Sequence, residues 1–129
     1  AIAFAGCGVE EVLLLTDREV DGATRYSDEG MLLQHAMARI RELDPDVLTG
    51  WNVVDFDLRV IQRRAEALRV PDEIGRIKGP MSLIQDRSFT RQSRAFVPGR
   101  QVLDGIALVR DAFIQRRFQS RHERDGQRR

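Results

Sequence analysis

The spacing of apolar residues predicts a β-hairpin at the start of the chain. Residues 1–5 and 11–15 are apolar and compatible with extended strands, and the segment between them contains Gly6 and Gly8. Glycine adopts positive φ angles at no steric cost, so these two positions favour a tight turn. The polar segment after the hairpin carries a second turn signal, Asp21-Gly22.

A helix, a short strand and a second helix are predicted next. Ser27 or Asp28 can cap the first helix, which ends at Asp44 because the residue before a proline is disfavoured in the α region. Residues 47–49 are apolar and too few for a helix, so they predict a buried strand. The second helix begins at Asp55, and this element order is typical of an α/β domain. The apolar positions with helical spacing are Leu33, Ala36, Met37, Ile40 and Leu43, then Leu58, Ile61, Ala65 and Leu68.

The remaining pattern predicts a loop, a second hairpin and a short helix. Residues 71–92 are mixed and polar, which indicates a loop or weak strands. Residues 94–97 and 101–103 are predicted to pair across a turn at Pro98-Gly99. The short helix begins at Asp104, which we interpret as its N-cap.

Apolar periodicity is lost beyond residue 113, so we divide the chain into a domain of residues 1–113 and a disordered tail of residues 114–129. The tail has six arginines against two acidic residues, a charge of +4. Residues 1–113 have 15 basic and 18 acidic groups, a charge of −3, so the charge of the domain does not predict a nucleic-acid binder. The tail is expected to be solvated, the alternative being salt-dependent phosphate binding.

Length and composition exclude several classes of protein. The chain has 129 residues, enough for one core, and its longest dense apolar run is residues 12–15, far short of a membrane span. Cys7 is the only cysteine, so an intrachain disulfide and a cysteine zinc site are excluded, as expected in the cytoplasm. His35 and His122 are too far apart to predict a histidine metal site. Because the sequence starts at Ala1 without methionine, we interpret it as part of a longer protein.

The candidate chemistry lies between the predicted strand and the second helix. Residues 44–57 read DPDVLTGWNVVDFD, which places Asp57 in the first helical turn after the carboxyl end of a strand. Open α/β sheets carry their binding sites at this edge. The alternative interpretation is that Asp55 and Asp57 only cap the helix and complement its dipole.

Residues 50–57, GWNVVDFD, resemble the second exonuclease motif of family B DNA polymerases, in which an asparagine, three variable residues and Phe-Asp follow one another. The opening hairpin and residues 99–106, GRQVLDGI, also resemble this family, above all its bacterial DNA polymerase II branch. The resemblance covers about residues 1–113. It implies an RNase H-like α/β fold, a mixed sheet flanked by helices, and 3′-to-5′ proofreading hydrolysis of DNA ends.

The resemblance also implies roles for three residues. Asp57 corresponds to the catalytic carboxylate of the motif, one of four that hold two Mg²⁺ or Mn²⁺ ions. By analogy, Asn52 orders the strand-to-helix loop and Phe56 packs into the core, both near the substrate. The implied partners are a single-stranded DNA 3′ end or primer terminus and the rest of a polymerase chain in a bacterial, nucleoid-associated setting.

Two motifs of the family have no counterpart here. The first motif, Asp-x-Glu, lies in the family just before the point where this chain starts, and no strand-like segment contains it. The third needs a tyrosine four positions before an aspartate, whereas Tyr26 is the only tyrosine and position 30 is Gly30. We therefore predict an incomplete fold with unpaired strand edges, weak self-association, and no metal-dependent exonuclease activity of this chain alone.

Other interpretations stay open at this point. The chain could be a non-catalytic RNase H-like domain with a structural or DNA-binding role, or another nuclease of the same four-carboxylate superfamily. The tail departs from the family after about Phe113, which indicates either a change of reading frame or a natural basic extension.

Overall fold

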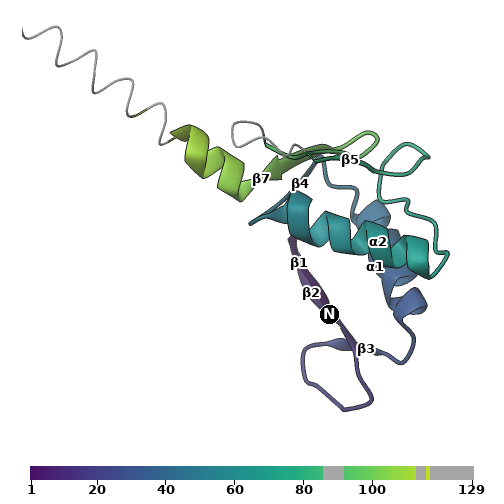
Figure 1. The fold of residues 1–129 in the computed structure, drawn as a ribbon. Coiled ribbons are helices and arrows are strands. Elements are labelled where there is room, and N and C mark those ends of the chain that lie inside the picture. Colours follow the sequence, from purple (N-terminus) through teal and green to yellow (C-terminus); the bar gives the residue numbers. More distant parts are fainter. Residues whose placement is uncertain (86–91, 113–115, 117–129) are drawn as a thin grey trace, which may run out of the picture.

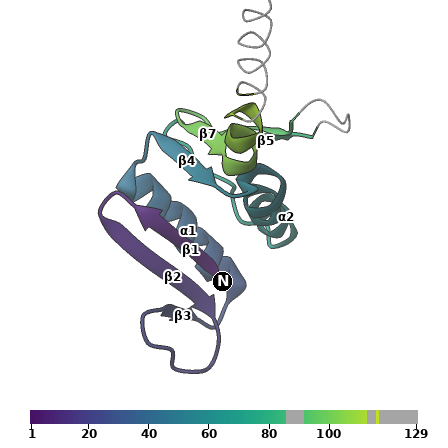
Figure 2. The same cartoon turned by 90° about the vertical axis from the view of Figure 1, so that its left-hand side faces the viewer.

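The computed structural model describes residues 1–85, 92–112 and Arg116, and it confirms an α/β fold (Figure 1). The strands within these described ranges form three small sheets rather than one continuous sheet. Figure 2 shows the first sheet and the β4–β7 pair as separate groups of strands, with α1 alongside the β1–β2 hairpin. The elements are β1 (Ile2–Gly6), β2 (Val9–Leu15), β3 (Thr24–Tyr26), α1 (Glu29–Leu43), β4 (Val47–Gly50), the π-helix η1 (Val53–Leu58), α2 (Arg59–Ala67), β5 (Ser82–Ile84), β6 (Arg94–Phe96) and β7 (Gln101–Asp104), followed by helical residues 105–112.

The first hairpin is confirmed. β1 and β2 are antiparallel and joined by Cys7 and Gly8, whose φ angles of 50° and 79° are both positive, as in the two-residue turns that match strand twist. The polar segment after β2 contains a strand that the pattern did not predict, since β3 pairs in parallel with the end of β2 over three residues. A strand this short carries too few residues to show an alternating pattern.

Helix α1 is confirmed, and its two ends have local causes. The Asp28 side chain accepts a hydrogen bond from the Met31 backbone N–H at 2.8 Å, which caps the N-terminus. Asp44 ends the helix in the left-handed conformation, directly before Pro45. Leu32 and Ala36 pack with Leu13 of the first sheet in one apolar cluster, so α1 anchors the hairpin sheet.

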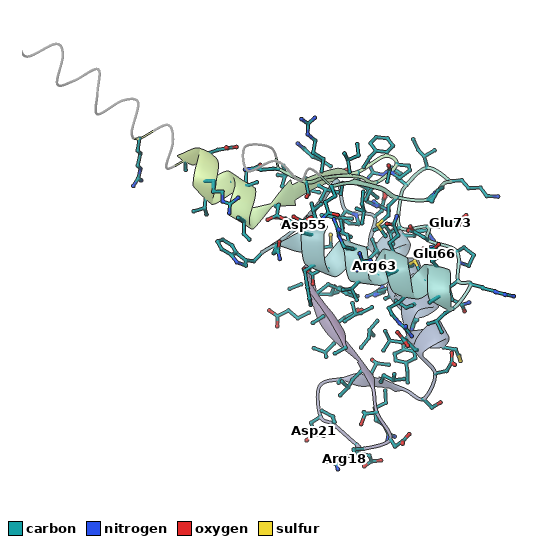
Figure 3. All side chains as sticks on the ribbon, in the orientation of Figure 1. Arg18, Asp21, Asp55, Arg63, Glu66 and Glu73 are labelled. Atoms are coloured by element: carbon teal, nitrogen blue, oxygen red, sulfur yellow. The ribbon has the colours of Figure 1, made fainter. Side chains whose placement is uncertain are left out.

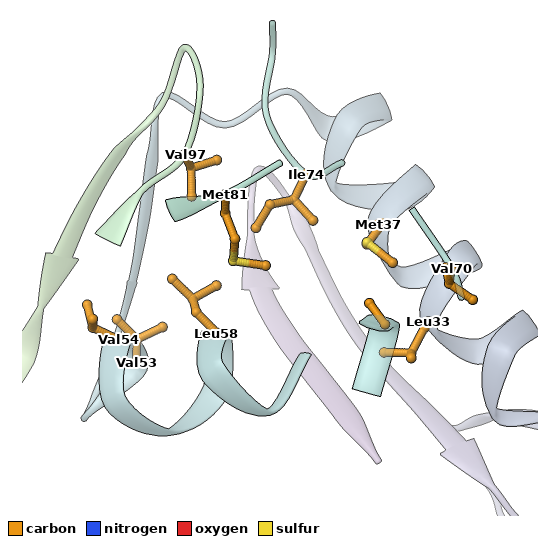
Figure 4. Close-up of a cluster of buried hydrophobic side chains, with 10 residues drawn as sticks. Leu33, Met37, Val53, Val54, Leu58, Val70, Ile74, Met81 and Val97 are labelled. Carbon is orange, nitrogen blue, oxygen red and sulfur yellow. The ribbon is translucent and has the colours of Figure 1, made fainter. Parts of the chain in front are cut away.

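The larger apolar cluster joins α1 to the second half of the chain (Figure 4). η1 and α2 form one continuous helical segment that starts two residues before the predicted Asp55. The wider π-turn directs Val53, Val54 and Leu58 inward. The buried members of the cluster are Leu33, Met37, Val53, Val54, Leu58, Ala65, Val70, Ile74, Met81 and Val97.

The predicted second hairpin is wrong in its pairing. The turn at Pro98-Gly99 is present, with the Arg100 N–H donating to the Val97 carbonyl at 3.0 Å. However, β6 pairs with β5, which is the weak strand expected within residues 71–92, and β7 pairs in parallel with β4. A turn signal fixes where the chain reverses, whereas the partner of each strand is chosen by packing against distant residues.

The described helices are short, and most of the C-terminal tail lies outside the described residues. None of the helices in the described ranges is long and apolar enough to cross a membrane. The predicted disordered tail, residues 114–129, lies outside the described residues except for Arg116, and the division of the chain at residue 113 stays a prediction.

Gly75→Ala is expected to lower the free energy of unfolding by about 3 kcal/mol, because the added Cβ would lie 2.6 Å from the backbone oxygen of Pro98. That carbonyl also accepts from the Arg76 N–H at 2.8 Å, so the turn cannot move away freely. Urea unfolding monitored by circular dichroism measures the change. The matched control is Gly22→Ala, where the new Cβ meets nothing within 4 Å and only the φ of 77° costs about 1 kcal/mol. Equal losses in the two variants would contradict the expectation.

Asp72→Asn is expected to raise the melting temperature at pH 7. Burial is the largest cause of a raised pKa of Asp72, opposed by hydrogen bonds from Gln62 and the Met81 backbone. Its Oδ1 is buried with no hydrogen-bond partner among the described residues. A raised folded-state pKa means that Asp72 favours folding when protonated and loses this contribution as the pH rises through that pKa.

The stabilisation by Asp72→Asn should therefore disappear near pH 3, where aspartate is protonated in both states (about pKa 4 when unfolded). Thermal melts at the two pH values, with exposed Asp21→Asn as the control, measure this difference. If Asp72→Asn raised the melting temperature by the same amount at both pH values, the charge of Asp72 would not be the cause of the increase.

Candidate functional site

The candidate site lies where two parallel strands end side by side. Gly50 at the end of β4 is in register with Asp104 at the end of β7, and the Thr49 hydroxyl donates to the Leu103 carbonyl at 2.8 Å. From Gly50 the chain turns into η1, and from Asp104 it continues directly into helical residues 105–112. Figure 3 shows Asp55 of η1 on the side of the molecule where helical residues 105–112 begin.

Asn52 forms the turn between β4 and η1. Its backbone is left-handed, with φ 58° and ψ 32°, a conformation that asparagine tolerates better than most residues. Its carbonyl accepts from the Phe56 N–H at 3.0 Å, and its own N–H donates to Asp104 Oδ1 at 3.2 Å. The contacts that order the loop therefore come from the backbone of Asn52, and its side chain makes no capping hydrogen bond.

The π-turn places three consecutive side chains, Asp55, Phe56 and Asp57, at the surface. The predicted packing of Phe56 into the core is wrong, because 61% of its surface is exposed. Neighbouring Trp51 is 67% exposed. Sequence patterns count large aromatic residues as core, and only the geometry of η1 shows that Val53 and Val54 occupy the core instead.

The two aspartates of η1 have different surroundings. Asp55 forms an ion pair with Arg59 at 3.0 Å, four residues further along the helix. Within residues 1–85 and 92–112, no hydrogen bond or ion pair reaches the Asp57 carboxylate. Asp57 is also not an N-cap, since the N-cap positions of η1 and α2 are Asn52 and Leu58. The geometry therefore gives the Asp57 side chain no capping role and leaves it open to solvent.

Asp104 makes the densest polar contacts of this region. The predicted N-cap is present, because Oδ1 accepts from the Ile106 N–H at 2.9 Å. The carboxylate also accepts from the backbone of the neighbouring element, Oδ1 from Asn52 at 3.2 Å and Oδ2 from Val54 at 3.2 Å. Sequence reasoning missed these two contacts, since they join residues about fifty positions apart.

A second polar cluster lies at the opposite end of β4. Arg76 and Arg100 both donate to Asp44 Oδ1 at 2.8 Å, and Arg76 also pairs with Asp46 at 2.8 Å. Hydrogen bonds from Arg76 and then Arg100 are the largest causes of the lowered pKa of Asp44. These contacts join the start of β4 to the segments before and after the Pro98-Gly99 turn, so we assign them to the fold.

The described residues do not by themselves fit a two-cation site. No group of three or more histidine, cysteine, aspartate or glutamate side chains is clustered in residues 1–85 and 92–112. His35 instead bonds to the Tyr26 hydroxyl and packs edge-to-face on its ring, with ring centroids 5.5 Å apart. His122 lies outside the described residues. Of the implied metal carboxylates, the described part of the chain places Asp57 alone at the candidate site.

Comparison with known proteins identifies the family. Residues 8–118 match the model of the DNA polymerase family B exonuclease domain, and the chain belongs to this family. It is 32% identical over 118 residues to DNA polymerase II of Escherichia coli, covering 87% of this chain and 15% of that protein. It is also 45% identical over 86 residues to the DNA polymerase delta catalytic subunit of Bos taurus, covering 65% of this chain and 7% of that protein. The corresponding subunit of Drosophila melanogaster is 38% identical over 96 residues, covering 67% of this chain and 9% of that protein.

Proposed function

We propose that this chain forms part of the 3′-to-5′ proofreading exonuclease of a polymerase II-like family B DNA polymerase, and that Asp57 is a catalytic carboxylate of that exonuclease. One observation carries the assignment of Asp57. The Asn-x-x-x-Phe-Asp segment lies at the carboxyl ends of two parallel strands, and its aspartate is exposed without a structural contact among the described residues. The complete enzyme would synthesise DNA and excise errors in replication and repair.

The chemistry proposed for the complete domain uses Mg²⁺ or Mn²⁺. Two such ions, bound by carboxylates, would activate a water and stabilise the leaving 3′ oxygen. This chain contributes Asp57 to that set, and one carboxylate cannot hold two cations. We therefore propose that the 129-residue chain alone has no exonuclease activity.

The substrate of the proposed activity is the 3′ end of single-stranded DNA or a frayed primer. Phe56 and Trp51 are exposed, directly precede Asp57 and Asn52 in the sequence, and offer ring faces on which bases can stack. The other proposed partner is the rest of the polymerase chain, and weak self-association through uncovered strand edges is expected without it. The cytoplasm, near the nucleoid, is the proposed location.

A chimera tests this proposal. Residues 1–112 of this chain replace the matching segment of Escherichia coli DNA polymerase II, and 3′-labelled single-stranded DNA is incubated with Mg²⁺ or Mn²⁺. We expect the chimera to shorten the DNA, and the isolated chain to leave it intact. Polymerase activity of the chimera serves as the control for folding.

The alternative is a non-catalytic RNase H-like domain with a structural or DNA-binding role. The absence of a three-residue metal cluster from the described ranges favours it. A chimera that polymerises normally but removes no 3′ nucleotides would support this alternative and contradict the proposed exonuclease.

A further inference from the structure

We propose that Asp104 is a positioning residue of the exonuclease site, which fixes the segment that carries Asp57. This inference rests on the proposed function of Asp57. Asp104 lies on β7, beside Gly50 across the parallel pair, and therefore at the point where both chains leave the sheet.

The Asp104 carboxylate joins the beginnings of two helices. Oδ1 accepts from the N–H groups of Asn52 at 3.2 Å and Ile106 at 2.9 Å, and Oδ2 accepts from that of Val54 at 3.2 Å. These N–H groups lie at the N-termini of η1 and of helical residues 105–112, where backbone donors have no acceptor within their own helix. The negative charge also complements the dipoles of both helices. One side chain thus holds two helix starts together.

The packing around Asp104 requires this close approach. A Cβ at Gly105 would lie 3.2 Å from Cε3 of Trp51 and 3.3 Å from the Gly50 oxygen. Because Gly105 has no side chain, the start of helical residues 105–112 can pack against the loop between β4 and η1. The Trp51 ring lies against Gly105, and Trp51 is 67% exposed. The loop is therefore held by hydrogen bonds and by direct packing.

The direction of Asp57 depends on this arrangement. The Asp57 side chain has no hydrogen bond or ion pair within the described ranges, so its position follows the backbone of η1. That backbone is tied to Asp104 at Asn52 and at Val54, three residues before Asp57. Disturbing Asp104 should therefore misplace the catalytic carboxylate and change the surroundings of Trp51, while DNA contacts made by the rest of the polymerase stay in place.

The test is Asp104→Asn in the chimera. The amide oxygen can still accept two N–H groups, but the NH₂ group replaces Oδ2 and meets the Val54 N–H, donor against donor. We expect kcat for 3′ excision to fall about 10- to 100-fold, the loss typical of a residue that orients a ligand, with KM for DNA within about twofold. Polymerase activity should be unchanged, and Asp104→Glu, which keeps the acceptor charge, should recover part of kcat. The control is Asp111→Asn, an exposed residue on the same helix with the same change of charge.

A second readout uses the 129-residue chain. Trp51 is its only tryptophan, so its emission reports on the loop, and ¹⁵N NMR reports on the backbone amides. We expect Asp104→Asn to shift the amides of Val54 and Asp57 and to change the Trp51 emission, with no change in Asp111→Asn.

The outcomes separate this inference from the proposed function. A wild-type chimera without excision contradicts the proposed function, and unchanged Val54 and Asp57 amides in Asp104→Asn then overturn the positioning role independently. An active chimera whose Asp104→Asn variant keeps the wild-type kcat overturns the positioning role alone. If Asp104→Asn lost both polymerase activity and excision, Asp104 would have a role in the whole fold, and this outcome would also overturn the positioning role.

Discussion

Asp57→Ala in the chimera is expected to lower the rate of 3′ excision by about 10²- to 10³-fold, the loss typical of one electrostatic group in a catalytic site. The carboxylate is exposed and makes no stabilising contact within the described residues, so its removal should leave the melting temperature unchanged. Excision of 3′-labelled single-stranded DNA over a range of Mg²⁺ and Mn²⁺ concentrations measures the effect. A lower rate with an intact fold would assign Asp57 to the chemistry.

The matched control for Asp57→Ala is Asp55→Ala. Asp55 lies on the same exposed turn, two residues away, but its carboxylate is paired with Arg59 at 3.0 Å. We expect excision within about twofold of the chimera and a loss of stability below about 1 kcal/mol, as for an exposed ion pair. If Asp55→Ala abolished excision and Asp57→Ala did not, the residue assignment would be wrong.

Arg100→Met is expected to lower the free energy of unfolding by about 3 to 5 kcal/mol, because the carbonyl oxygens of Ile74 and Pro45 lose their donor at about 1 to 3 kcal/mol each. The side chain is 1% exposed and donates to the Ile74 carbonyl at 2.8 Å, to Asp44 Oδ1 at 2.8 Å and to the Pro45 carbonyl at 2.6 Å. Methionine fills much of the volume but donates no hydrogen bond, so buried carbonyl oxygens lose their partner. Urea unfolding of the 129-residue chain measures the loss.

Arg76→Met is the matched control, because Arg76 binds the same oxygen of Asp44 from a side chain that is 39% exposed. Water can replace the lost donor there, and we expect a loss of about 1 kcal/mol or less. Similar losses in the two variants would show that burial of Arg100 is not what makes its contacts important. The contributions of Arg100 and Arg76 to stability through Asp44 should both weaken in acid. The pKa of Asp44 is lowered in the folded state, and its stabilising charge is lost as the pH falls through that pKa.

Local sequence determined the elements whose causes are local. The glycines around Cys7 fix the first turn, Asp28 and Pro45 set the two ends of α1, and the short apolar run before Gly50 specifies β4. The predicted burial of this strand is wrong, because Val47 is 40% exposed and no residue of β4 is fully buried. Each signal acts within a few residues of the structure that it produces. The Asn-x-x-x-Phe-Asp spacing likewise identified the segment that holds the candidate site, since a motif is itself a local pattern.

Tertiary structure alone decided the contacts between distant segments. The Pro98-Gly99 turn could be predicted from the sequence, but the pairing of β7 with β4 could not. Many apolar strands have the same alternation of side chains, and tertiary packing selects among them. The exposure of Phe56 follows from the π-turn, which gives the core positions to Val53 and Val54. The sequence predicted Asp104 only as the N-cap of its own helix. The parallel pairing of β4 and β7 brings its second oxygen to the Val54 amide, fifty residues away.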